Sequence, residues 1–259
     1  MRLMINHQTH YVYTDVVNRS IQYIKMTPST NAHQQVQNWD VSVPGQRDMQ
    51  LDTFGNVWLT TTQREPYLQM TIMAQGIVEM NLNSTDSNSD DLNPKLFLQP
   101  TPSTQCDIHM KSFADCYVSR INRANLIRLA EAILTHIPYV SNQTSVRTSA
   151  IDAFHYKQGV CQDHSHIMIA MCRYLGIPAR YISGYLFVPN SSHLASHAWV
   201  EVYIENKWYC FDVSNQLFTP QSHIYVAIGR DYWDVAPVRG VRDKGGIESM
   251  SSIVQVLSC

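Results

Sequence analysis

The sequence predicts an α+β protein in which an all-β domain precedes a mixed domain. Three observations predict this fold class. Residues 1–80 carry runs of alternating aromatic and β-branched side chains, which are typical of strands. Residues 81–105 are polar and then proline-containing, which is typical of a linker. Residues 106–259 show helical periodicity first and alternating patterns afterwards, as in a domain of helices followed by an antiparallel sheet.

The all-β domain at residues 1–80 consists of short runs separated by turn signals. Pro44-Gly45 breaks one run, and Asp52-Thr53-Phe54-Gly55-Asn56 predicts a turn. Gly76 interrupts the last run, where a β-bulge is expected. The even spacing predicts an antiparallel sandwich or half-barrel. The expected strands cover residues 9–13, 20–24, 35–43, 57–62 and 67–80.

The linker at residues 81–105 has two parts. Residues 81–91 read Asn-Leu-Asn-Ser-Thr-Asp-Ser-Asn-Ser-Asp-Asp and carry too few apolar side chains to pack a core. Pro94, Pro100 and Pro102 then favour an extended chain. We therefore place a domain boundary here.

The mixed domain at residues 106–259 begins with helical patterns. These patterns cover residues 125–136 and 149–156, and a third begins at Cys161. Gly176 and Pro178 end the third helix. Strands are expected at residues 180–188, 196–204, 207–213 and 223–228, and the tail at 252–257 is expected to add a fifth strand to the same sheet.

Cys161 lies where the third helix should begin, in the stretch Gly159-Val160-Cys161-Gln162-Asp163-His164. A thiol at a helix N-terminus feels the positive end of the helix dipole and the unpaired N–H groups of the first turn. Both favour the thiolate, which is the nucleophilic form of cysteine. A buried structural cysteine is the alternative interpretation of this position taken by itself.

Two later residues complete a candidate catalytic group. Period two places His197 and Glu201 on one face of their strand, and Asp212 on the same face of the next strand. If the hairpin turns at Glu205-Asn206, His197 and Asp212 become diagonal neighbours. Cys161 would then attack a carbonyl carbon, His197 would transfer protons, and Asp212 would orient the imidazole.

Other polar residues near Cys161 have weaker assignments. The backbone N–H of Cys161 is one expected oxyanion donor. The second donor is open between Gln158, Tyr139 and Tyr156. Asp163 is expected to cap its helix or pair with an arginine rather than act in catalysis.

Two further residues have mainly structural expectations. Glu201 shares the His197 face and is a candidate to support it. His166 is expected to be a packed core histidine. With His164 it cannot bind one metal ion from a single helix face, since such ligands need a spacing of three or four residues. We expect neither a metal ion nor another cofactor.

The composition argues against several classes of protein. The 259-residue chain has a formal net charge of −2, so neither nucleic acid nor an anionic membrane is an expected partner. None of its six cysteines forms a C-x-x-C pair, which argues against structural zinc. No secretory signal and no membrane-spanning run is expected. We therefore expect a cytoplasmic protein with free thiols, although Cys106 and Cys116 could pair after export by another route.

Four segments closely resemble the bacterial transglutaminase-like core, whose fold is shared with papain-like cysteine enzymes. The resemblance covers residues 120–215 strongly and implies that Cys161, His197 and Asp212 form a Cys-His-Asp triad. Residues 229–240 resemble the segment that follows this core, and residues 1–80 resemble the β-rich region that often precedes it. The four segments are Gly159–His164, Arg173–Tyr185, His197–Val202 and Trp208–Val213.

The expected function is acyl-enzyme catalysis on an amide or peptide bond of a peptide or protein substrate. The relatives implied by the resemblance include peptidases, amidases, cross-linking transferases and inactive domains, so hydrolysis and transfer to an amine both stay open, with hydrolysis favoured. The alternative is a non-catalytic binding or scaffold module on the same fold. A cysteine-based redox or metal protein fits least, because the chain has no resolving C-x-x-C partner.

Overall fold

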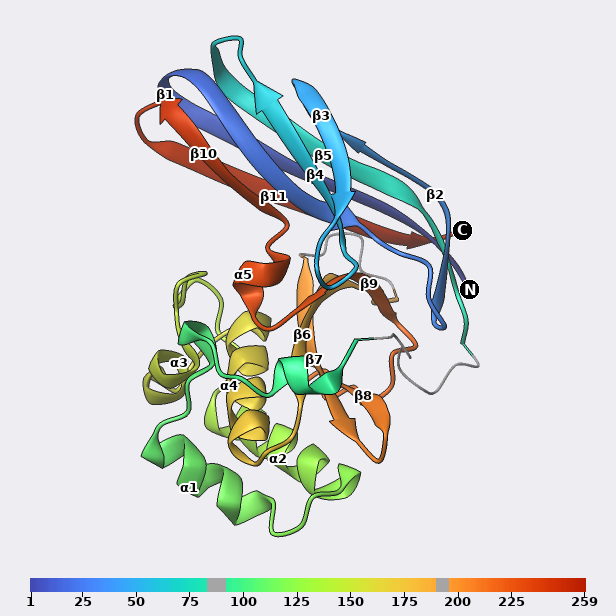
Figure 1. The fold of residues 1–259 in the computed structure, drawn as a ribbon, viewed down its shortest axis with the longest axis vertical. Helices are drawn as coiled ribbons and strands as arrows, with labels where there is room; N and C mark the ends of the chain where they lie inside the picture. Colours follow the sequence, from blue (N-terminus) through green and yellow to red (C-terminus); the bar gives the residue numbers. More distant parts are fainter. Residues whose placement is uncertain (83–91, 190–195) are drawn as a thin grey trace.

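The computed structural model describes residues 1–82, 92–189 and 196–259. It contains two antiparallel sheets, the larger of seven strands and the smaller of four. In Figure 1 the larger sheet lies across the top, and the smaller sheet lies beneath it with the helices packed beside it. The predicted α+β class with an all-β N-terminal sheet is confirmed.

The larger sheet is built around β1 (Arg2–Thr27). The first half of β1 pairs with β5 and β11, and its second half pairs with β4 and β10. The predicted separation into strands at 9–13 and 20–24 is wrong, because the polar residues between them form register shifts and no turn. The other strands are β2 (Gln34–Ser42), β3 (Gln46–Leu51), β4 (Val57–Gln63), β5 (Tyr67–Met80), β10 (Val238–Lys244) and β11 (Glu248–Ser258).

The bulge expected at Gly76 lies on the neighbouring strand instead. Gly76 stays in the ladder opposite Trp39, and the register shifts between Val36 and Asn38 of β2. A Cβ atom at Gly76 would lie 2.3 Å from the Asn38 carbonyl oxygen. The glycine therefore permits a close approach of two backbones, which is the other common reason for glycine inside a strand.

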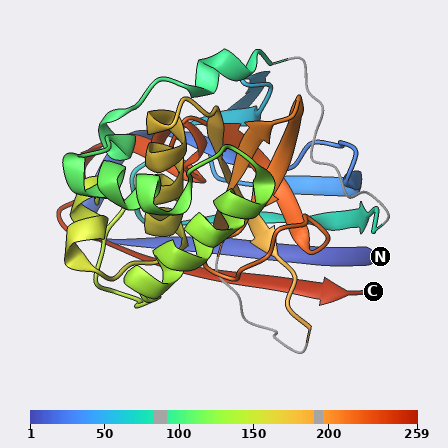
Figure 2. The same ribbon diagram turned by 90° about the horizontal axis from the view of Figure 1, so that it is seen from below.

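The C-terminal strands belong to the first sheet. The prediction that residues 252–257 close the second sheet is wrong, since β11 pairs with β1 from Leu3 opposite Ser258 to Tyr13 opposite Glu248. The expected 106–259 domain thus contributes its last two strands to the N-terminal sheet. This pairing joins the two ends of the described chain (Figure 2), and no local sequence signal specifies such a distant partner.

Part of the expected linker is packed against the mixed domain. Residues 83–91 lie outside the described residues. After them come two short 3₁₀ turns, η1 (Pro94–Phe97) and η2 (Pro102–Thr104). Phe97 is fully buried, and its carbonyl accepts a hydrogen bond from Arg173 Nε at 2.9 Å. This segment therefore covers the helices, and its prolines do not simply extend the chain.

The mixed domain places one helix at its centre. Helix α4 (Cys161–Tyr174) is buried from Asp163 to Arg173 and packs on the smaller sheet. Helix α1 was not expected from the sequence. The remaining helices are α1 (Ile108–Tyr117), α2 (Arg123–His136), α3 (Ala150–Tyr156) and α5 (Tyr232–Val235). The smaller sheet has the order β8-β7-β6-β9, with strands β6 (Ala179–Leu186), β7 (His197–Ile204), β8 (Lys207–Phe211) and β9 (His223–Gly229).

The two sheets share a hydrophobic cluster. Leu3 of β1, Val78 of β5 and Val254 of β11 are fully buried against Tyr185 and Ile224 of the smaller sheet. The N-terminal sheet is therefore fixed directly against the strands that follow Cys161. Among the described residues, no helix is both long and apolar enough to cross a membrane.

Val254→Ala should lower the free energy of unfolding by about 2 kcal/mol, because two buried methyl groups are lost from the cluster between the sheets. The control is Ile253→Ala on the same strand, whose side chain is 55% exposed and whose loss should cost less than about 0.5 kcal/mol. Urea unfolding of both variants measures the difference. Equal losses would contradict the placement of β11.

Candidate active site

The start of α4 leaves backbone donors around Cys161. The N-cap residue is Val160, whose side chain has no oxygen that could accept hydrogen bonds from the N–H groups of the first turn. Asp163 Oδ2 accepts instead from the Val160 N–H at 2.8 Å and from Thr144 Oγ1 at 2.7 Å. A Cβ at Gly159 would lie 2.7 Å from the Asp163 Cβ, so the glycine makes room for this contact. Asp163, the third residue of α4, thus accepts from the N–H of the N-cap residue, a contact of the helix-capping kind that was one of its two expected structural roles.

The β7–β8 hairpin has the predicted register. Ile204 lies opposite Lys207, and the two turn residues Glu205 and Asn206 have φ values of 53° and 60°. Two left-handed residues in a two-residue loop match the twist of the flanking strands. The register brings His197 Nε2 to 2.7 Å from Asp212 Oδ2, so the two side chains share a face as the sequence predicted.

Asp212 is fully buried and accepts hydrogen bonds from several donors. Its Oδ2 accepts from His197 Nε2, from His223 Nε2 at 3.0 Å and from Asn215 Nδ2 at 2.9 Å. Its Oδ1 accepts from the Asn215 backbone N–H at 3.1 Å. Sequence reasoning missed both His223 and Asn215. His223 is the first residue of β9, and only the strand order places it beside Asp212.

The electrostatics favour a negatively charged Asp212 beside a positively charged His197. Burial raises the pKa of Asp212, but its hydrogen bonds with His197 and His223 outweigh burial and hold it well below its usual range. Burial also disfavours the charged form of His197 and so lowers its pKa. Its hydrogen bonds with Asp212 and Cys161 act in the opposite direction and raise the pKa of His197 to about 10. His197 Nε2 faces Asp212, so Nδ1 is the nitrogen left for the Cys161 sulfur. The arrangement is suited to an imidazolium that lies beside the Cys161 sulfur.

A buried histidine supports the loop after Asp212. His164 Nε2 donates to the Ile137 carbonyl at 2.7 Å, so His164 Nδ1 is left to accept from the Ser214 hydroxyl at 2.8 Å. Ser214 lies between Asp212 and Asn215 in the chain. Helix α4 therefore positions both Cys161, at its first residue, and the loop that holds His197.

The weaker candidates differ in their partners and in whether they line the cavity beside Cys161. Glu201 is fully buried and pairs with Arg180 at 2.6 Å, so it stabilises the sheet below His197. Gln158 Nε2 donates to Gln143 Oε1 at 3.5 Å at the surface. Tyr139 lines the same cavity as Cys161 and is the candidate donor that remains beside it.

Two other residues singled out in the sequence lie in very different surroundings. His166 is a fully buried core histidine, as expected, and its Nε2 accepts the Tyr232 N–H at 3.2 Å. Tyr156 is 58% exposed.

His197, Asp212 and His223 also form a group with ligand atoms within 4.8 Å of one another, the type of group that can hold a metal ion. In the structure both imidazole Nε2 atoms lie at hydrogen-bond distance from one carboxylate oxygen. An N–H that donates to a carboxylate has no lone pair to offer a metal ion. With a proton on each Nε2, both imidazoles therefore donate to Asp212.

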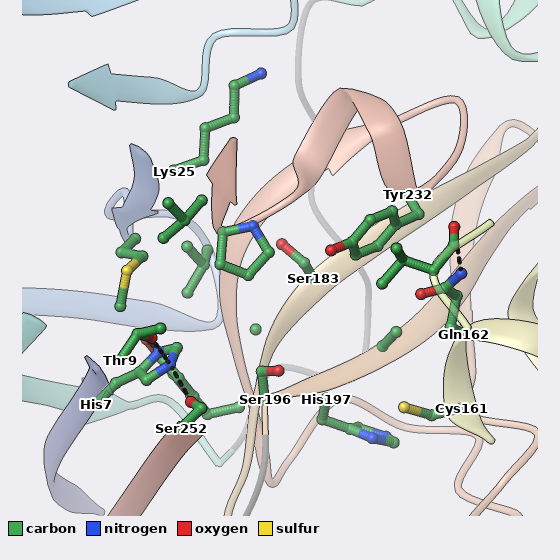
Figure 3. A pocket seen from close by; sticks show the side chains of 18 of the residues that line it. His7, Thr9, Lys25, Cys161, Gln162, Ser183, Ser196, His197, Tyr232 and Ser252 are labelled. Carbon is green, nitrogen blue, oxygen red and sulfur yellow. Dashed lines mark hydrogen bonds between the residues drawn. The ribbon is translucent and has the colours of Figure 1, made fainter. Parts of the chain in front are cut away.

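A cavity of about 350 Å³ opens beside Cys161 and His197. Its walls come from both sheets, because β1 and β11 contribute side chains opposite the start of α4. Figure 3 shows Cys161 and His197 at one side of this cavity and His7, Thr9 and Ser252 at the other. The first sheet thus completes the space in which a substrate would meet the thiol.

His197 should stay protonated until about pH 10, and Asp212→Asn should lower that titration midpoint, because the neutral amide removes the negative charge that raises the pKa of His197. NMR of isotope-labelled histidine side chains measures both proteins. His7 is an internal control, because burial lowers its pKa to about 4. A His197 midpoint near 6.5 in the unaltered protein would contradict the ion-pair arrangement.

Comparison with known proteins agrees with this architecture. A family model described as the bacterial transglutaminase-like N-terminal region matches residues 3–79, and one described as the transglutaminase-like superfamily matches residues 119–213. An uncharacterised protein of Mycobacterium leprae is 27% identical over 274 residues, with 98% of each chain covered. An uncharacterised protein of Mycobacterium tuberculosis is 27% identical over 273 residues, with 93% of this chain and 87% of that protein covered.

A solved structure shares the whole fold. It is titled "The Crystal Structure of a Putative Cysteine Protease from Cytophaga hutchinsonii" and superposes with a TM-score of 0.81 at 23% identity, covering 99% of this chain and 90% of that chain. The N-terminal sheet and the helical core are therefore found together in another protein. The chain therefore carries a region that matches the transglutaminase-like superfamily, preceded by a region that matches the bacterial transglutaminase-like N-terminal region, as the resemblance indicated.

Proposed function

We propose that this protein is a cysteine-dependent acyl-enzyme catalyst that cleaves an amide bond of a peptide or protein. The observation that carries the proposal is the hydrogen-bonded series from Cys161 through His197 to the buried Asp212. A structural cysteine needs no such partners. Cys161 is also partly exposed and lines the cavity, so a substrate can reach its sulfur.

The proposed reaction has two halves. The Cys161 thiolate attacks the substrate carbonyl carbon, and the Cys161 backbone N–H stabilises the oxyanion that forms. The imidazolium of His197 gives its proton to the leaving amine as the carbon–nitrogen bond breaks, which leaves a thioester. Neutral His197 then removes a proton from water, the hydroxide oxygen bonds to the acyl carbon, and the acid and the thiolate separate.

We favour water over an amine as the acceptor of the acyl group, because water always competes and the sequence presents no motif for an amine site. Both outcomes share the thioester. They differ only in the second half-reaction, so a product assay separates them.

Cys161 should react with an iodoacetamide probe at neutral pH faster than the exposed Cys116 and Cys259, since only Cys161 has an imidazolium partner. Labelling followed by peptide mass spectrometry gives the rate at each site. Cys161→Ala should abolish the fast labelling, and the control Cys116→Ala should leave it unchanged. Equal rates at the three thiols would favour a non-catalytic binding module.

Incubation with peptide substrates and a dansylated amine should yield free acid in large excess over dansylated peptide, because the proposal assigns the acyl group to water. Mass spectrometry quantifies both products. If dansylated peptide is the main product, the reaction is transfer to an amine and not hydrolysis. Cys161→Ala should form neither product. Products that persist in Cys161→Ala would contradict the assignment of the nucleophile.

A further inference from the structure

The wall of the cavity opposite Cys161 is polar and is supplied mainly by the first sheet. His7 Nδ1 lies 3.0 Å from Tyr185 Oη, and His7 Nε2 lies 3.0 Å from Ser252 Oγ and 3.3 Å from Thr9 Oγ1. These four residues, here the His7 cluster, all line the cavity. His7, Thr9 and Tyr185 are buried, whereas Ser252 is exposed to the space (Figure 3).

The His7 cluster has more hydrogen-bond donors than it uses. With the proton on Nε2, Nδ1 accepts from Tyr185, and the hydroxyl hydrogens of Ser252 and Thr9 remain. With the proton on Nδ1, Tyr185 keeps its hydrogen, and only one of the other two hydroxyls can donate to Nε2. Two hydroxyl hydrogens are therefore left over for either tautomer. Within the part of the chain that the structure describes, no further acceptor is assigned to them.

The cavity wall offers no charge for an ionic substrate group at this end. Burial lowers the pKa of His7 to about 4, so the cluster is neutral at pH 7. Lys25 also lines the cavity, but its Nζ binds Asp52 Oδ2 at 2.5 Å and the Asp234 carbonyl at 2.6 Å, and Figure 3 shows the amine directed away from the cluster. A charged group placed here would lose its hydration without a partner.

The rest of the wall between Cys161 and the His7 cluster is largely apolar. Tyr181, Ala198, Val226, Val238 and Met250 are among the residues that form it. A volume of about 350 Å³ lies at the small end of ligand pockets. The space therefore suits a short apolar stem that ends in a neutral hydrogen-bond acceptor.

We propose that the His7 cluster is the acyl-donor subsite of the enzyme and binds the carbonyl oxygen of a neutral amide group in the substrate. This inference rests on the function proposed above. A carbonyl oxygen has two lone pairs, which match the two spare hydroxyl hydrogens. A carboxylate group of a substrate would find no positive charge here. A hydrocarbon group would displace water and leave both hydroxyls without an acceptor.

Two sources of this amide are compatible with the chemistry, namely a glutamine or asparagine side chain and the neighbouring peptide group. Fluorogenic amides of acetyl-Gln, acetyl-Glu, acetyl-Leu and 4-methylpentanoic acid separate them. A side-chain amide predicts that acetyl-Gln is cleaved faster than acetyl-Leu. A peptide group predicts that acetyl-Gln and acetyl-Leu are cleaved equally and faster than the 4-methylpentanoyl amide, which has no second carbonyl. Acetyl-Glu should be cleaved slowest among the acetylated substrates.

Ser252→Ala should lower kcat/KM for the preferred amide-bearing substrate about fivefold, the usual effect of one lost hydrogen bond to a neutral group, and should not lower it for the 4-methylpentanoyl amide. Thr9→Val should act in the same way. The matched control is Ser251→Ala, which alters the adjacent residue of β11, paired with His10 and not with Thr9. Equal losses on all substrates, or none, would overturn the subsite.

A binding measurement separates this inference from the proposed function. N-acetylglutamine amide should shift the His7 ring signals in NMR spectra of Cys161→Ala, and Ser252→Ala in the same background should weaken the binding about fivefold. If no substrate is cleaved but these shifts occur, the proposed reaction fails and the subsite stands. If substrates are cleaved without preference and the His7 signals do not move, the reaction stands and the subsite fails.

Discussion

The buried carboxylate of Asp212 is the constraint on which the arrangement of the site depends. A charge without solvent is costly to bury unless hydrogen bonds surround it. Here His197, His223 and Asn215 meet that requirement, and each comes from a different part of the chain. Because the same carboxylate holds the imidazole of His197, the groups that stabilise the charge also help to orient that ring toward Cys161.

Local patterns were sufficient to predict the helix start at Cys161 and the shared face of His197 and Asp212. Helix periodicity placed Cys161 at the first residue of α4, and strand alternation with a two-residue turn placed His197 and Asp212 on one face. Each of these features depends on a few neighbouring residues. His223 could not be found in this way, because it meets Asp212 only after β9 has joined the far edge of the sheet.

The errors in the predicted fold also arise from contacts between residues far apart in the sequence. Sequence patterns correctly indicated that residues 252–257 form a strand, but they gave its partner wrongly, since β11 pairs with a strand more than two hundred residues earlier. The choice of partner depends on shape and on which apolar faces remain uncovered when the sheets meet. Residues Leu3, Val78 and Val254 provide that face, and it becomes visible only when all three strands are side by side.

The pairing of β1 with β11 also has a consequence for the order in which the protein matures. During synthesis, Cys161, His197 and Asp212 are all complete before the ribosome reaches Ser252. The central strand of the large sheet must therefore wait for one of its partners, and contacts between such distant segments form slowly. Cys161 and Ser252 line the same cavity, so a nascent chain carries this thiol before it carries the β11 side of the cavity wall.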